Sequence, residues 1–420
     1  MNNETLHLKN YIQTTVKKHE DFRNSCINLV ASENAMSPIV RSLLSTDLAQ
    51  RYGDYTDRDL EARRYFGTEF IITLEQEVSR LACELFHTKY VELRPLSGHM
   101  AGNSVIQSLC NPGDTVLELG RFQGGHRLAT KFADCPLISL DVRYLPFDDK
   151  EYNIDVEKTI QIIEEYHPRL VIVGASNFLF PIPLRELALG IKKISSDTIL
   201  TYDASHVLGL IAGGLFQSPL DEGASLVFGG TQKSFPGPQG GLIYSNSYDL
   251  IERVSSGVYP ASVSNHHLSR LPSLGIAMVE MKLWGSDYAK HVIENAKTLA
   301  NELANLNIPI VSNGKVFTES HTVLIKTAEL GKSDELGRLL EKAGIIVTAI
   351  HLPEALGREG LRLGTNEITR RGAKTEHIIN IASLIADVIF KRRSYESIRE
   401  EIQYLSRSLS SYAFTWLETI

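Results

Sequence analysis

The sequence predicts an α/β protein built on a mainly parallel β-sheet, followed by a smaller α+β domain. A chain of 420 residues is long enough for two or three structural units with large buried cores. Apolar residues make up 43% and charged residues 22%, which excludes disordered, collagenous and coiled-coil chains. From about residue 70, short β-rich runs alternate with helical stretches. Such alternation is typical of crossover units, whose strands run parallel.

Three parts are expected along the chain. Residues 1–35 form a polar N-terminal arm with a weak helical pattern. Residues 36–285 form the large α/β domain, with strands predicted at 115–119, 137–140, 170–173, 199–202, 226–228 and 242–244. Residues 286–420 form the small C-terminal domain, with a long helical segment and strands predicted at 321–326 and 345–347. Two closing helices are predicted because apolar residues recur near the helical period at 378, 381, 385 and 388, then at 398, 402, 405 and 409.

Charge and composition limit which binding partners and which cellular compartment are expected. A net charge of −7 gives no general basic surface for nucleic acid or anionic lipid, so we expect no nucleic acid and no membrane as partner. No run of about 18 apolar residues occurs, and the first residues lack a secretion pattern, so we expect a cytoplasmic protein. The 4 cysteines show no zinc spacing, which favours reduced thiols and no metal site.

Two polar segments follow neighbouring strand runs and indicate the chemistry. Asp203 ends one run, with His206 close behind, and Lys233 follows the next run before a loop rich in glycine and proline. A carboxylate beside a pyridinium nitrogen keeps that ring protonated, and a lysine amine forms a Schiff base with an aldehyde. These are the two requirements of pyridoxal phosphate. The sequence contains no Walker loop, no HExxH motif and no G-x-S-x-G elbow.

Two further motifs fit a phosphorylated, planar cofactor. Ser97 and Gly98 precede an apolar helical stretch, where backbone N–H groups and the positive end of a helix dipole favour a phosphate. His126 follows two glycines, which permit close backbone approach, so its imidazole is suited to stack on a flat ring or to move protons.

The motifs together give a specific resemblance. In order they are Ala31-Ser32-Glu33-Asn34, Ser97-Gly98, Gly124-Gly125-His126, Asp203-Ala204-Ser205-His206, Lys233 with Gly237-Pro238-Gln239-Gly240-Gly241, and the arginine-containing stretch 361–372. From about residue 27 to the C-terminus the sequence resembles the serine hydroxymethyltransferase family of fold-type I pyridoxal-phosphate enzymes, and its archaeal-type members above all. The resemblance implies a homodimer with shared active sites that acts on an amino acid and, in some members, an aldehyde.

The resemblance also implies roles for individual residues. It implies a catalytic set of Lys233, His126, Asp54, Tyr52 and His206. It implies cofactor contacts from Ser97, Gly98, His99, His126, Ser176, Asp203, His206, Gln232 and Lys233. It implies substrate contacts from Ser32, Tyr52, Tyr65 and Arg362. Within these sets, Lys233 would carry the Schiff base, Asp203 would face the pyridine nitrogen and His126 would stack on the ring. Ser32 and Arg362 would hold the substrate carboxylate, and Tyr52 would reach the neighbouring subunit's site.

The sequence departs from the family around the folate side of that site. The segment after Tyr52 is longer than the family's, Asp54 replaces its glutamate and Phe66 replaces its second tyrosine. His99 stands where Ser or Thr is usual, Gln232 replaces a histidine, and the stretch 348–351 lacks the asparagine that contacts the pterin. These changes predict that tetrahydrofolate binding is altered or lost.

The leading hypothesis is therefore cleavage or formation of the Cα–Cβ bond of a β-hydroxy amino acid without folate, as in threonine transaldolases. Two alternatives stay open: ordinary hydroxymethyl transfer between serine and tetrahydrofolate, and elimination or decarboxylating deamination in a specialised-metabolite pathway. A scaffold without enzymatic activity is disfavoured because Lys233 and Arg362 are both present.

Overall fold

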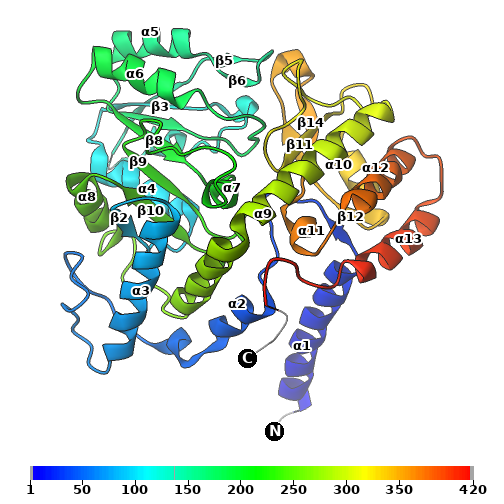
Figure 1. The fold of residues 1–420 in the computed structure, drawn as a ribbon, viewed down its shortest axis with the longest axis horizontal. Coiled ribbons are helices and arrows are strands. Elements are labelled where there is room, and N and C mark those ends of the chain that lie inside the picture. The colour runs from blue at the N-terminus through cyan, green and yellow to red at the C-terminus, as the bar shows by residue number, and fades with distance from the viewer. Residues whose placement is uncertain (1–2, 137, 417–420) are drawn as a thin grey trace.

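The computed structural model describes residues 3–136 and 138–416, which form a large lobe and a smaller lobe (Figure 1). The long helix α9 (Arg270–Asn305) runs through both lobes. Its residues up to Val292 pack in the core of the large lobe, and those from Ala296 onward pack in the core of the small lobe. The boundary expected after residue 285 thus falls inside a continuous helix, and the division into three parts stays a prediction.

The large lobe contains a seven-stranded sheet with the order β2-β10-β9-β8-β7-β3-β4. Its strands are β2 (Tyr90–Glu92), β3 (Thr115–Glu118), β4 (Asp141–Tyr144), β7 (Leu170–Val173), β8 (Ile199–Asp203), β9 (Leu226–Gly230) and β10 (Gly241–Ser245). Strand β10 is antiparallel to both of its neighbours, and the other neighbouring pairs are parallel. The predicted mainly parallel sheet is confirmed.

One predicted strand is wrong. Residues 138–140 form a turn and an extended stretch, and the edge strand β4 follows them at Asp141–Tyr144; Leu137 lies outside the described residues. Leu140 is buried in the core beside α4 (Gly98–Leu109) instead of pairing in the sheet. The true strand is polar and largely exposed, so its sequence carries no apolar run.

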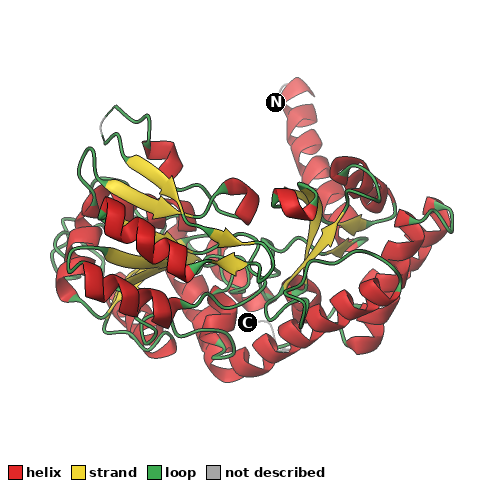
Figure 2. Ribbon diagram, turned by 90° about the horizontal axis from the view of Figure 1, so that it is seen from above, coloured by secondary structure: helices red, strands yellow, loops and turns green. Residues whose placement is uncertain are grey.

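Helices cover both faces of this sheet, as Figure 2 shows from above. Helices α4 and α8 (Tyr248–Val258) pack on one face. The other face is covered by α3 (Glu69–Leu85), α5 (Val156–Tyr166), α6 (Leu184–Ile194), α7 (Leu208–Ala212) and the first half of α9. The carboxyl ends of the central strands are left uncovered by these helices, which is where ligands bind in open α/β sheets.

The small lobe is an antiparallel sheet of order β11-β14-β13 packed against helices. Its elements are β11 (Thr322–Lys326), α10 (Ser333–Lys342), β12 (Ile345–Ile346), β13 (Thr348–His351), β14 (Glu359–Gly364), α11 (Asn366–Arg370), α12 (Thr375–Ile389) and α13 (Tyr395–Ser408). The two closing helices are confirmed as α12 and α13, since the apolar positions that predicted them are buried.

The N-terminal segment is built into the small lobe. Helix α1 (Asn3–Asn24) projects from the molecule in Figure 1, and β1 (Ile27–Asn28) pairs in parallel with β12. The short helix α2 (Pro38–Ser42) and the small hairpin of β5 (Phe147–Asp148) and β6 (Asn153–Ile154) complete the structure. In the described part of the chain no helix is long and apolar enough to cross a membrane.

Candidate active site

The carboxyl ends of β7, β8 and β9 bring the predicted acid and lysine together. Asp203 is the last residue of β8, and Lys233 lies in the loop after β9. The Ser205 N–H donates to Asp203 Oδ1 at 2.9 Å, which fixes the orientation of the carboxylate. The Gly230 N–H donates to Ser205 Oγ at 3.2 Å, so the two strand ends are tied to each other.

The backbone of Lys233 is held rigidly, whereas its amine has no ion-pair partner among the described residues. The Asn34 side-chain amide donates to the Lys233 carbonyl at 2.7 Å. Burial lowers the pKa of Lys233, and the Arg362 charge lowers it further against the opposing effect of Asp203. A lowered pKa increases the fraction of neutral amine, which is the nucleophile in Schiff-base chemistry.

The N-terminus of α4 provides a cradle that fits a phosphate. The hydroxyl of Ser97 caps the helix by accepting from Met100 N at 3.1 Å. A Cβ added at Gly98 would lie 2.7 Å from Gly230 N, so only glycine lets the helix start against the end of β9. Free N–H groups and the positive end of the helix dipole therefore point to the same strand ends as Lys233.

Two histidines stand next to each other beside this cradle. His99 Nδ1 lies 3.2 Å from His126 Nε2, and the rings meet edge to face with centroids 5.4 Å apart. Gly125 is required before His126 because a Cβ there would lie 1.8 Å from the Leu119 carbonyl oxygen. Burial lowers the pKa of His126, with Asp203 raising it and Lys233 lowering it, and burial also lowers the pKa of His99. Both imidazoles are thus favoured in the neutral form.

Arg362, on strand β14 of the small lobe, places a guanidinium group near Lys233. Its Nη1 donates to the Ser176 carbonyl at 2.8 Å, while its Nε is buried without a partner. Burial lowers the pKa of Arg362 to about 10, although Tyr152 raises it. A buried guanidinium with an unused N–H is costly unless an anion completes it, and its planar fork matches a carboxylate.

His206 is stacked on a second histidine that the sequence did not single out. The rings of His206 and His321 are nearly parallel with centroids 5.9 Å apart, and His321 Nε2 lies 3.2 Å from the Ala31 carbonyl oxygen. Burial lowers the pKa of His206 well below its usual range and that of His321 to about 3. Both rings are therefore neutral, and the Nδ1 atoms of both are buried without partners.

Asn34 and Asn366 are further residues that sequence reasoning missed. Asn34 donates to Tyr288 Oη at 2.8 Å as well as to the Lys233 carbonyl, and Asn366 Nδ2 reaches the same carbonyl at 3.4 Å. Asn34 lies in the quoted Ala-Ser-Glu-Asn motif. The motif indicates that this part of the chain belongs to the site, but it does not indicate that Asn34 binds the Lys233 carbonyl. Asn366 lies in the quoted stretch 361–372 and His321 begins the strand predicted at 321–326, but neither pattern indicates that these side chains reach the site from the small lobe.

The remaining predicted residues form two groups: Ser32 and Gln232 border the Lys233 cluster, since Asn34 lines the same groove, and the residues around Tyr52 lie apart from it. Ser32 and Gln232 line a groove of about 750 Å³ next to α1, and Gln232 Oε1 is buried without a partner. Tyr52 and Tyr65 contact each other with ring centroids 5.5 Å apart, and Asp54 Oδ2 accepts from the Tyr259 hydroxyl at 3.1 Å. Among the described residues, no hydrogen bond, ion pair or ring contact links these three to Lys233.

Comparisons with known proteins identify the family and the fold. The family model described as serine hydroxymethyltransferase matches residues 7–385. A serine hydroxymethyltransferase of Methanopyrus kandleri is 38% identical over 404 residues, which cover 95% of this chain and 93% of that protein. One from Staphylothermus marinus is 37% identical over 400 residues, covering 94% and 90%. The solved structure of an L-threonine transaldolase from Pseudomonas fluorescens, in its internal aldimine state, superposes with a TM-score of 0.92 at 30% identity and covers 98% of this chain and 94% of that one.

The fold and these matches define a fold-type I enzyme that uses pyridoxal phosphate. The cradle at Ser97 and Gly98, the fixed Asp203 carboxylate and the neutral-leaning Lys233 amine fit that cofactor. The chain belongs to the serine hydroxymethyltransferase family.

Proposed function

We propose that this enzyme cleaves or forms the Cα–Cβ bond of a β-hydroxy amino acid and does so without tetrahydrofolate. The observation that carries the proposal is a contrast within one chain. Lys233, Asp203 and Arg362 share one cluster, whereas Asp54 is engaged by Tyr259 and Phe66 has no hydroxyl. The residues that we assign to the cofactor and the amino acid are thus together in one cluster. The residues at the family's folate positions are altered.

The chain's own residues bind and orient the reactants. When bound, pyridoxal phosphate supplies an aldehyde that takes up the substrate amine and a ring that accepts the electron pair of the broken bond. Lys233 would hold the cofactor through its amine, and Asp203 would pair with the ring nitrogen. His126 would lie against the ring, and Ser97, Gly98 and His99 would hold the phosphate at the start of α4.

The substrate carboxylate is bound by Arg362 with Ser32. His206 and Ser176 would contact the cofactor near its phenolic oxygen, and Gln232 would contact it from the residue before the lysine. We propose that Tyr52, Asp54 and Tyr65 complete the site of a second subunit in a homodimer. The support is that Tyr52 and Tyr65 are 54% and 44% exposed and make no polar or ring contact with Lys233 in their own chain.

The pterin side of the site is also changed in the small lobe. His351 stands in the stretch 348–351, and its Nε2 accepts from Arg121 Nη2 at 2.7 Å. Its ring lies 5.5 Å from that of Phe122. Each missing hydrogen-bond partner at a buried contact costs about 1–3 kcal/mol, so two or three such losses weaken folate binding by orders of magnitude.

The test is an initial-rate assay with L-threonine, L-serine and glycine, each with and without tetrahydrofolate, and with an aromatic aldehyde as acceptor. We expect amino-acid turnover without folate, and a new β-hydroxy amino acid when threonine and the aldehyde are combined. Saturable stimulation of serine cleavage by micromolar tetrahydrofolate would contradict the proposal.

Ordinary hydroxymethyl transfer is the second candidate, because curated relatives up to 38% identical carry that name. It predicts folate-dependent formation of glycine from serine in the same assay. Release of ammonia or CO₂ from the amino acid without an aldehyde product would instead point to elimination or decarboxylating deamination.

A further inference from the structure

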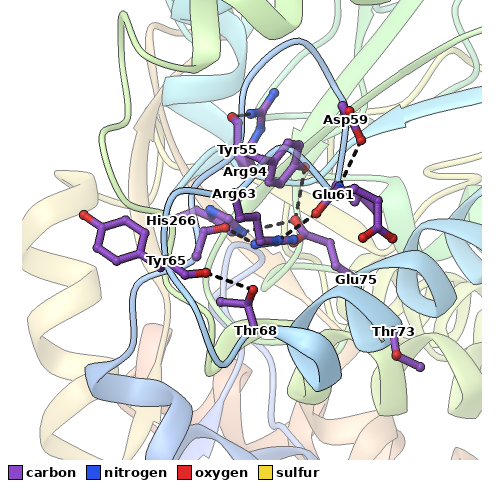
Figure 3. Close-up of polar contacts among 12 residues, drawn as sticks. Tyr55, Asp59, Glu61, Arg63, Tyr65, Thr68, Thr73, Glu75, Arg94 and His266 are labelled. Atoms are coloured by element: carbon purple, nitrogen blue, oxygen red, sulfur yellow. Dashed lines mark hydrogen bonds and ion pairs between the residues drawn. The ribbon is translucent and has the colours of Figure 1, made fainter.

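The segment that carries Tyr52, Asp54 and Tyr65 packs against a buried cluster of charged side chains around Glu75 of α3. Figure 3 shows the contacts of Glu75. The side chains of Glu75 and Arg63 are each only 1% exposed, and Arg63 Nη2 lies 2.5 Å from Glu75 Oε2. The other carboxylate oxygen, Oε1, accepts from the Tyr55 hydroxyl at 3.1 Å and lies 3.1 Å from His266 Nε2. Glu75 therefore joins three partners from two different segments.

A second buried pair supports the first. Arg94 donates twice to Glu92, at 2.9 and 2.6 Å, and once to the Tyr55 carbonyl at 3.1 Å. The guanidinium groups of Arg94 and Arg63 lie 4.4 and 4.8 Å from the centroid of the Tyr55 ring. The Tyr55 ring thus lies next to two cations, one that follows strand β2 and one from its own segment.

The cluster fixes the conformation of residues 53–68. Besides its contact with Glu75, Arg63 donates to the carbonyls of Gly53 and Leu60, so it closes the segment on itself. The turn 264–267 joins the same unit, because His266 meets Glu75 and Asn265 Nδ2 reaches the Arg51 carbonyl at 3.5 Å. Buried ion pairs contribute little net stability, and their best-attested role is to select one conformation.

Tyr52, which directly precedes this segment, and two aromatic residues within it are exposed. Tyr52 is 54% exposed, Tyr65 is 44% exposed and Phe66 is 100% exposed. Clustered exposed aromatics on a fixed base are typical of interaction sites. The occupant that fits is a second copy of this chain, because these side chains find no site in their own chain and the proposed homodimer places them at the partner's.

We propose that Glu75 is a positioning residue that fixes segment 53–68 and the turn 264–267 as one unit, and that this unit acts on the active site of the partner subunit. The inference rests on the proposed function only for the shared site; the positioning itself rests on the contacts of Glu75.

The first measurement is hydrogen exchange of the holoenzyme, comparing wild type with Glu75→Gln and with the matched control Glu84→Gln. Glu84 lies on the same helix but in an exposed ion-pair network with Arg80 and Lys282. We expect faster exchange over 53–68 and 264–267 in Glu75→Gln alone, with the borohydride-reducible link at Lys233 intact. We expect kcat/KM to fall roughly 100-fold, the loss typical of a displacement of about 1 Å at a reacting group.

The second measurement is complementation in a purified heterodimer of a Lys233→Ala subunit and a Glu75→Gln subunit. Both homodimers are impaired, but one site of the heterodimer combines an intact lysine with an intact segment from the other chain. We expect about half of the wild-type activity per dimer, since one of two symmetry-related sites is whole. A heterodimer of Lys233→Ala with Tyr52→Phe serves as the reference for site sharing.

The outcomes are separable. Unchanged exchange over 53–68 in Glu75→Gln, or an inactive Glu75→Gln heterodimer beside an active Tyr52→Phe one, would overturn the proposal while leaving the shared site in place. If both heterodimers are inactive, the result contradicts both the action of the unit on the partner subunit and the sharing of active sites between subunits. Turnover of an amino acid by the wild-type enzyme tests the proposed function separately from either result.

Discussion

The Lys233 cluster and the Glu75 cluster are both buried and polar, yet they use charge in opposite ways. Around Lys233, pKa values are moved toward neutral forms by burial, and polar atoms such as Arg362 Nε and His206 Nδ1 have no partner. Around Glu75, cations and carboxylates are paired at short distances. Burial raises the pKa of Glu75, but the opposing effects of His266 and Arg63 together are larger, so the net shift is downward.

The difference separates chemistry from positioning. Unsatisfied buried groups are costly, and they persist where a ligand completes them. In the Glu75 cluster the carboxylates are paired with arginines, although both ring nitrogens of His266 have no hydrogen-bond partner among the described residues, and such buried ion pairs hold one conformation. Four substitutions test this separation of chemistry from positioning.

Lys233→Ala should abolish turnover, because it removes the buried amine that we propose as the Schiff-base partner. The covalent adduct seen after borohydride reduction should also disappear by mass spectrometry. Lys131→Ala is the matched control, since Lys131 is near enough to lower the pKa of both His99 and His126. An adduct that survives in Lys233→Ala would remove the lysine from its role.

Glu92→Gln should destabilise the fold by about 3–5 kcal/mol, because it leaves the buried Arg94 charge unpaired. The Arg94 guanidinium holds the pKa of Glu92 at about 2 against the effect of burial. Urea unfolding followed by circular dichroism measures the change. Equal stability of Glu92→Gln and wild type would contradict a fully paired cluster.

Arg362→Lys should raise KM for the amino acid roughly 10- to 100-fold, since a point charge cannot replace a bidentate fork and charged hydrogen bonds contribute about 1.5–3 kcal/mol. Arg358→Lys is the control, because Arg358 is exposed and paired only with Glu354. An unchanged KM in Arg362→Lys would show that the carboxylate is bound elsewhere.

His321→Asn should flatten the loss of stability on mild acidification. The pKa of His321 is lowered from 6.5 to about 3 by burial, so the unfolded chain binds a proton that the folded chain does not. Stability is therefore full above 6.5 and falls as the pH drops, by roughly 2 kcal/mol between pH 7 and pH 5 for this group. Urea midpoints at several pH values test this.

The control for the acid titration is His87→Asn, at an exposed position whose φ of 50° asparagine tolerates. We expect its pH dependence to match that of wild type. A slope in His321→Asn that also equals the wild-type slope would mean that other groups govern acid stability.

Sequence patterns are enough to predict the α/β class, the order of the central elements and the nearness of Asp203 to Lys233. These depend on short-range patterns: apolar runs mark buried parallel strands, and the carboxyl ends of neighbouring strands meet by geometry. The polar edge strand β4 escaped prediction because an exposed edge needs no apolar run.

Each of the two clusters also contains residues far apart in the sequence, which local patterns do not bring together. His321 reaches His206 from the small lobe, Asn366 reaches the Lys233 carbonyl, and Glu75 gathers Arg63 and His266. Tyr52, Asp54 and Tyr65, which resemblance grouped with Lys233, lie apart from it in the single chain. The physical reason is that local periodicity fixes elements, whereas the packing of two lobes and a long surface segment depends on side-chain contacts between residues far apart in the sequence.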